Sequence, residues 1–347
     1  MLALKDIKSM MLCELKEDLA ADGTEEYRAR QVYEWLSKGI SSFQEMTNIS
    51  LKMRQALQKK YCLYGVRIKK KFISQKDGTI KYLFSLHDGG LIESVLMKYE
   101  HGYSVCISTQ VGCRMGCSFC ATGKDKFLRS LYPSEMLSQI QEIQNDNGIN
   151  ISNVVLMGMG EPLDNYDNTV KFLKLISSKD GMNIGMRHIS VSTCGLADKI
   201  YKLAEEKLPI TLSISLHTPS DNFRDEIMPI NKVWKINDIM AACKYYIKMT
   251  GRRISFEYAM IKDFNDGKKD AQNLVNLLKG ILCHVNLIPI NSVSESNFKR
   301  SESCKIKKFV NILTQKGINT TVRRTLGPDI EASCGQLRQR EESHKEE

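Results

Sequence analysis

Three cysteines stand within eight residues of this chain, in the segment Cys113-Arg-Met-Gly-Cys117-Ser-Phe-Cys120. Three thiolates in one short loop can surround a single polynuclear metal centre. A structural zinc site normally has four ligands, often from two paired knuckles, and no second pair stands nearby in the sequence. Three ligands leave one iron of a [4Fe-4S] cube open, and an open metal position can bind a small molecule. We therefore expect an iron–sulfur cluster with one vacant corner, and keep a zinc loop as the alternative.

Further polar residues follow apolar runs that are typical of buried strands. If those strands are parallel, their carboxyl ends meet at one mouth, where chemistry gathers in barrel folds. Each such residue taken singly could equally be a turn or helix cap. Together with their neighbours Gly160 and Leu216 they predict a binding site; the full set is Gly160, Glu161, Ser192, Ser215, Leu216, His217 and Asn291.

Two cysteines outside the loop also attract attention. Cys106 precedes the loop by seven positions, and Cys334 lies near the C-terminus. The chain has 11 cysteines, an odd number, and does not start with a secretion signal. A disulfide scaffold is therefore not expected, although a lone cysteine is more often buried filler than a reactive group.

The elements that position these residues are predicted from hydrophobic periodicity. Between residues 105 and 325, short apolar strands alternate with amphipathic helices, which predicts right-handed crossovers and a parallel sheet. About six such units suggest an α/β fold of the partial TIM-type barrel kind. Before them, residues 5–62 show helical spacing, and residues 67–97 contain hairpin signals at 76–78 and 88–90. We expect a helical accessory domain at 1–64, a β-hairpin extension at 65–98, the barrel with its C-terminal loop at 99–335, and a charged tail at 336–347.

The net charge of +10 favours a polyanionic partner, although many bacterial proteins are mildly basic. The strand predicted at Arg67–Ile73 carries much of this charge, and is either an RNA-facing surface or a solvated edge that resists aggregation. No apolar stretch approaches the length of a membrane span, and the first residues do not resemble a signal peptide. We expect a cytoplasmic protein.

The cysteine loop resembles the hallmark of the radical S-adenosylmethionine (SAM) superfamily, whose CxxxCxxC follows the first barrel strand. Beyond it, nearly the whole chain resembles the RlmN/Cfr family of RNA methyltransferases that use two further cysteines. The resemblance implies a [4Fe-4S] cluster on Cys113, Cys117 and Cys120, with SAM on its open iron. It also implies that the polar residues at the strand ends contact SAM. The segments that carry it are 30–36, 106–113, 158–162, 215–217, 228–231 and 332–337.

The family resemblance further implies a mechanism that uses two SAM molecules per turnover. One methylates Cys334, and the other supplies a radical that takes a hydrogen from that methyl group. The methylene radical adds to an adenine carbon and leaves a protein–RNA crosslink, which Cys106 resolves by forming a transient disulfide with Cys334. Glu93 stands where the family places the acceptor of the adenine proton; it could instead be an outward-facing strand carboxylate.

Within the family, the RlmN branch methylates C2 of adenosine 2503 in 23S rRNA and of adenosine 37 in tRNAs, whereas the Cfr branch methylates C8 of the ribosomal adenosine. The segment Asn286-Leu-Ile-Pro is similar to the RlmN form, while Ile290, Ser292 and the thiol of Cys194 depart from it. The implied partners are 23S rRNA, tRNA and an electron donor such as flavodoxin or ferredoxin. We expect a monomer. A metal-stabilised RNA-binding protein without catalysis is the alternative from another class.

Overall fold

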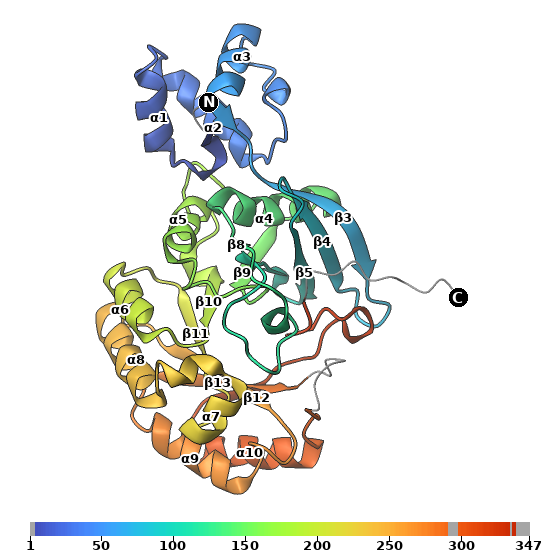
Figure 1. The fold of residues 1–347 in the computed structure, drawn as a ribbon, viewed down its shortest axis with the longest axis vertical. Coiled ribbons are helices and arrows are strands. Elements are labelled where there is room, and N and C mark those ends of the chain that lie inside the picture. Colours follow the sequence, from blue (N-terminus) through green and yellow to red (C-terminus); the bar gives the residue numbers. More distant parts are fainter. Residues whose placement is uncertain (1–3, 291–297, 334, 338–347) are drawn as a thin grey trace.

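The computed structural model describes residues 4–290, 298–333 and 335–337. A small helical lobe stands at one end, with α1 (Leu12–Ala20), α2 (Glu26–Ser37) and α3 (Leu51–Lys60). In Figure 1 this lobe lies above the rest of the chain. It has its own buried cluster, which includes Leu15, Val32 and Tyr61.

The first helix begins later than its apolar spacing suggested. Residues Lys5–Asp6 form a short strand, β1, which pairs in parallel with β2 (Tyr61–Cys62), and a 3₁₀ turn follows at Ile7–Ser9. The Asp6 carboxylate accepts hydrogen bonds from the hydroxyls of Ser9 and Ser134, at 2.5 and 2.6 Å. These contacts hold the segment against the barrel instead of extending the helix.

One sheet of ten strands organises the described part of the chain. Its antiparallel part is a meander of β3 (Val66–Ile73), β4 (Ile80–Leu86), β5 (Leu91–Tyr99) and β6 (Gly102–Cys106). From β6 the sheet continues in parallel through β9 (Ile151–Leu156), β10 (Ile189–Thr193), β11 (Thr211–Ser215), β12 (Ile254–Met260), β13 (Cys283–Pro289) and β14 (Thr320–Val322). The predicted hairpin strands thus share a sheet with the barrel strands.

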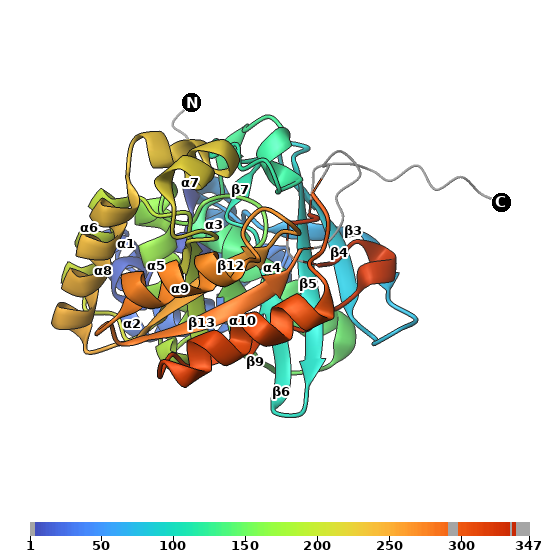
Figure 2. The ribbon, with the colours of Figure 1, turned by 90° about the horizontal axis from the view of Figure 1, so that it is seen from below.

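Helices cover the outer face of the parallel strands, as their amphipathic spacing predicts. They are α4 (Pro133–Asn147), α5 (Tyr166–Ile176), α6 (Ala197–Glu205), α8 (Ile236–Thr250), α9 (Lys268–Leu278) and α10 (Ser303–Gln315), and a short α7 (Asp221–Ile227) follows β11. Figure 2 shows the sheet curving past these helices with β3 and β14 unjoined. The expected partial α/β barrel is confirmed, with seven parallel strands among the described residues.

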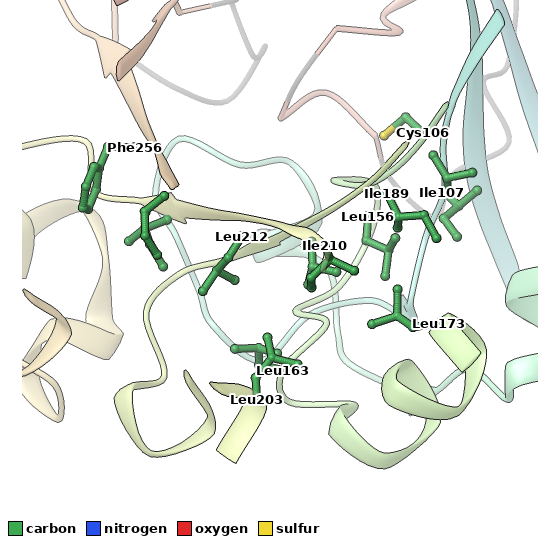
Figure 3. Packing of buried hydrophobic residues seen from close by; sticks show 14 of the residues in the cluster. Cys106, Ile107, Leu156, Leu163, Leu173, Ile189, Leu203, Ile210, Leu212 and Phe256 are labelled. Carbon is green, nitrogen blue, oxygen red and sulfur yellow. The ribbon is translucent and has the colours of Figure 1, made fainter. Parts of the chain in front are cut away.

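The core fills the space between strands and helices. Figure 3 shows Leu173 of α5 and Leu203 of α6 below the strand residues Leu156, Ile189 and Leu212. All five side chains are buried, and each buried leucine or isoleucine contributes about 1.5–3 kcal/mol to folding. This packed base fixes the strand ends that carry the candidate site. Among the described residues, none of the helices combines the length and hydrophobicity required to cross a bilayer.

Candidate active site

A cavity of about 1040 Å³, solvent at its mouth included, opens at the carboxyl ends of the parallel strands. We call it the main cavity. Most of the residues predicted to form the site line it, from the cysteine loop and from the ends of β9, β10 and β11. They are Cys113, Cys117, Cys120, Gly160, Glu161, Ser192, Ser215 and His217.

The other predicted residues lie elsewhere. The side chain of Leu216 is fully buried and does not line the main cavity. Cys106 ends β6 and lines a second cavity of about 550 Å³, which we call the Cys106 cavity. Glu93 is buried in β5. Asn291 and Cys334 fall outside the described residues.

The two cavities adjoin each other, because Met157, Ile288, Arg323 and Leu337 line both. Arg323 lies at this boundary and donates to the sulfur of Met157 at 3.4 Å. The structure places it between the cavities.

The residues on either side of Cys334 are held at this boundary. Ser333 lines the Cys106 cavity, and Gly335 lines the main cavity. The backbone N–H of Ala121, next to Cys120, donates to the Gly335 carbonyl at 2.8 Å. The Thr122 hydroxyl donates to the Leu337 carbonyl at 2.6 Å. The C-terminal segment is therefore bonded directly to the cysteine loop.

The three loop thiols fit an iron–sulfur cluster by their chemistry. Burial raises the pKa of Cys113 to about 12 and raises that of Cys117 as well, so both are neutral when no metal is bound. Metal ions replace such thiol protons and bind the thiolates. Within the described ranges no three His, Cys, Asp or Glu side chains are grouped around a single ion. Cys113, Cys117 and Cys120 instead face one shared volume, as the ligands of a larger cluster would.

Glu161 links two strand ends. Its Oε1 accepts the Leu163 N–H at 2.9 Å and its Oε2 accepts the Cys194 N–H at 2.7 Å. Burial nevertheless raises the pKa of this carboxyl, so a cation bound in the main cavity would favour its ionised form. Cys194, the unusual thiol of the sequence, lines the same cavity.

Packing requires a glycine at position 160. Its φ is +99°, and an added Cβ would lie 2.5 Å from the Cβ of Gln110 and 2.8 Å from its backbone nitrogen. The Gln110 side chain in turn accepts the Glu161 N–H at 2.9 Å. The hydrogen bond between Gln110 and the Glu161 N–H fixes the turn that positions the Glu161 carboxylate.

His217 presents a neutral ring. Burial, followed by the nearby Arg224, lowers the pKa of His217 to about 3. The Ala259 N–H donates to Nδ1 at 3.0 Å, so the ring hydrogen is on Nε2. The ring lies edge-on to Phe119 of the cysteine loop, with centroids 4.8 Å apart.

Two buried charged residues were missed by the motif analysis. Glu257 lines the main cavity and accepts the side-chain N–H of Asn286 at 2.8 Å; its signal was a carboxylate inside the apolar run Ile254–Met260. Arg224 is fully buried and donates to the carbonyls of Cys194, Ser215 and Leu216. Nothing in its local sequence marks it, since its partners come from other loops.

Comparisons with known proteins agree with this geometry. Residues 107–278 match the Radical SAM superfamily, and residues 5–63 match the ribosomal RNA large subunit methyltransferase N-terminal domain. A protein of Alkaliphilus oremlandii named "Probable dual-specificity RNA methyltransferase RlmN" is 51% identical over 96% of this chain and 98% of its own length. A protein of Clostridium tetani with the same name is 49% identical over 98% of this chain and 95% of its own.

A solved structure extends the agreement to three dimensions. The crystal structure of a radical SAM methyltransferase from Sphaerobacter thermophilus superposes with a TM-score of 0.92, at 41% identity over 97% of this chain and 100% of that one. Identity of this extent, over both the helical lobe and the barrel, decides the assignment. The chain belongs to the RlmN family of radical SAM enzymes.

Proposed function

We propose that this chain is an RNA methyltransferase that places a methyl group on C2 of adenosine 2503 in 23S rRNA and of adenosine 37 in tRNAs. The observation that supports it is the placement of the two neighbours of Cys334. Ser333 lies in the Cys106 cavity, and Gly335 lies in the main cavity on the cysteine loop. A thiol between them would be able to serve both sites in turn.

The reaction needs more than an ordinary displacement, because an electron-poor ring carbon does not attack the methyl group of SAM. Cys113, Cys117 and Cys120 would hold the cluster, which would supply the one-electron chemistry of the reaction: reduction of SAM to methionine and a 5′-deoxyadenosyl radical, and later acceptance of one electron from the RNA adduct. All remaining steps belong to residues of the chain.

Cys334 carries the methyl group. Its thiolate takes the methyl from a first SAM by displacement and releases S-adenosylhomocysteine. The 5′-deoxyadenosyl radical then takes a hydrogen atom from this methyl group and becomes 5′-deoxyadenosine, and the sulfur-bound methylene radical adds to the adenine C2. After one electron has left, Glu93 accepts the C2 proton and the ring is aromatic again.

Cys106 completes the turnover. Its thiolate attacks the sulfur of Cys334, the bond between that sulfur and the methylene carbon breaks, and the released carbon takes a proton to become the methyl group. The product is a Cys106–Cys334 disulfide, which an external dithiol must reduce. Cys106 ends β6 and lines the Cys106 cavity together with Ser333, the residue that precedes Cys334.

The strand ends would orient SAM. We assign Glu161 to the amino group of SAM, because it is the buried carboxylate beside the cysteine loop. Ser192, Ser215 and the Nε2–H of His217 supply hydrogen bonds from the neighbouring strands. Gly160 shapes the turn, Leu216 supports it from the core, and Asn291 follows β13.

The RNA must present an unstacked adenine to the cavity mouth. The exposed basic residues of β3, Arg67, Lys69 and Lys70, together with the overall charge of +10, suit contacts with its phosphates. A one-electron donor of the flavodoxin or ferredoxin kind would reduce the cluster.

Product analysis tests the function. The protein is reconstituted anaerobically with iron and sulfide, reduced, and given SAM with protein-free 23S rRNA or tRNA. We expect 5′-deoxyadenosine and 2-methyladenosine. Formation of 8-methyladenosine would indicate a Cfr-type enzyme instead, and a colourless zinc protein that leaves SAM intact would contradict catalysis altogether.

A further inference from the structure

A buried ion pair lies beside the Cys106 cavity. The Lys81 ammonium of β4 is 3.3 Å from Oε1 of Glu93 on β5, and the two residues are 1% and 3% exposed. The Lys81 nitrogen also lies 5.1 Å from the centre of the Phe72 ring. Fully buried lysines are rare, because the desolvated ammonium needs a counter-charge.

The strand register places this pair on the same sheet face as Cys106. Lys81 is directly opposite Val95, and Val95 is directly opposite Cys106. Residues opposite each other across strands point to one face, and so do residues two apart on one strand. Glu93 precedes Val95 by two positions, so Lys81, Glu93 and Cys106 all share this face.

This face meets the segment that carries Cys334. In the turn between β3 and β4, Asp77 accepts the Gly327 N–H at 2.9 Å, and the Ser74 hydroxyl donates to Asp329 at 2.7 Å. Ala332 and Ser333 then line the Cys106 cavity with Val95. Lys81 therefore stands four residues after Asp77, the turn residue that accepts the Gly327 N–H.

Stability gives no sufficient reason for two charges here. A buried ion pair stabilises the folded state little more than an apolar pair of the same volume, because the cost of desolvating the two charges offsets their attraction. What the ammonium does provide is a fixed counter-charge, which favours the ionised form of an adjacent buried carboxyl.

We propose that Lys81 is a positioning residue for proton transfer, whose ammonium keeps Glu93 ionised and directed along the Cys106 face. This inference rests on the proposed function. The proton moves from the adenine C2 to a Glu93 oxygen after carbon–carbon bond formation and loss of one electron, and Lys81 keeps its own proton throughout. Without the ammonium, the Glu93 carboxylate would lose the buried counter-charge 3.3 Å from its Oε1, and proton transfer to it would slow.

The test compares reconstituted Lys81→Met, Lys81→Arg, Glu93→Gln and the double variant Lys81→Met/Glu93→Gln with the wild type. Exposed Lys98 on β5 supplies the control, Lys98→Met. Each protein is assayed anaerobically for 5′-deoxyadenosine, for covalent RNA adduct and for 2-methyladenosine. We expect Lys81→Met to form 5′-deoxyadenosine within about twofold of wild type while 2-methyladenosine falls by about tenfold or more and adduct accumulates. Lys81→Arg should restore most of the product.

The double variant separates a role in proton transfer from a role in folding, since it removes both charges of the pair together. If Lys81 acts through Glu93, adding Lys81→Met to Glu93→Gln lowers product formation no further. Independent, multiplicative losses would overturn the proposal, as would a Lys81→Met enzyme that methylates like Lys98→Met. If 5′-deoxyadenosine and 2-methyladenosine fall by the same factor in both Lys81→Met and the double variant, Lys81 has only a structural role, and the proposal is overturned. A wild-type enzyme that forms no 2-methyladenosine overturns the proposed function, and this inference with it.

Discussion

Asp77 and Gly327 are 250 positions apart in the chain, yet the Asp77 carboxylate accepts the Gly327 N–H at 2.9 Å. Gly327 begins the turn that leads to Cys334, and its φ is +56°. Asp329, two residues on, accepts from the Ser74 hydroxyl and the Gln75 N–H. These two carboxylates fasten the segment that leads to Cys334 to the turn between β3 and β4.

Asp77→Ala should loosen this segment. The change removes a charge-assisted hydrogen bond that contributes about 1.5–3 kcal/mol, so we expect faster exchange of the Gly327 amide hydrogen and a lower methylation rate with the cluster retained. Hydrogen-exchange mass spectrometry of the peptide containing Gly327 measures the first effect. Asp263→Ala, at an exposed carboxylate far from this turn, is the control, and equal exchange in both variants would contradict the fastening role.

Two glycines with left-handed backbones should respond differently to alanine. Gly160 has φ +99° and no room for a Cβ, whereas Gly148, with φ +63°, caps α4 and has no atom within 4 Å of the added carbon. We expect Gly148→Ala to cost about 1 kcal/mol of unfolding free energy through backbone strain alone. Gly160→Ala should cost at least about 2 kcal/mol more and lower SAM binding. Equal costs in urea denaturation would refute the packing argument.

Arg129 is the bidentate partner of the buried carboxylate of Glu135. It donates to both oxygens at 2.8 Å, and the Glu135 side chain is fully buried. Arg129→Met would leave this carboxylate only the Tyr132 N–H at 2.9 Å and His87 at 3.4 Å, for which we expect a loss of about 3–5 kcal/mol in unfolding free energy. Asp88→Ala removes only the half-exposed partner of the same arginine and should cost less than about 1 kcal/mol.

The ion pair between Arg129 and Asp88 predicts that the free energy of unfolding depends on pH. The hydrogen bond from Arg129 is the largest cause that lowers the pKa of Asp88, from 3.8 to about 2. A lowered carboxyl pKa stabilises the fold above the unfolded pKa, and this contribution is lost as pH falls from about 4 to about 2. The unfolding free energies of wild type and Asp88→Asn should therefore converge over this window, and parallel curves would contradict the pairing.

Local sequence patterns predicted some residues of the candidate site but not the contacts that position the others. The loop Cys113–Cys120 and the strand-end residues Ser192 and Ser215 were predictable because apolar strands and their punctuation are local in sequence. The partner of Glu93 was not, because its meeting with Lys81 depends on the register of two strands. The docking of Gly327 on Asp77 depends likewise on a contact between residues 250 positions apart in the chain. The contacts that could not be predicted depend on strand register and tertiary packing, which hydrophobic periodicity does not encode.

Cluster assembly should depend on the loop thiols and not on every thiol of the main cavity. We expect Cys120→Ala to lose most of its iron and its brown colour after reconstitution, since two thiolates cannot hold the cube. Cys194→Ala, at a thiol that lines the same cavity from the end of β10, should keep both. Iron and sulfide analysis measures this, and a fully loaded Cys120→Ala protein would rule out the assigned ligand set.

The proposed function depends on the transfer of a methyl group through Cys334, with Cys106 as the resolving thiol. The most direct measurement is the mass of Cys106→Ala after anaerobic turnover with SAM and RNA, under denaturing conditions and after nuclease digestion. We expect an adenosine nucleotide joined to Cys334 through one extra carbon, with little free methylated RNA. A Cys106→Ala enzyme that turns over normally and carries no adduct would contradict it.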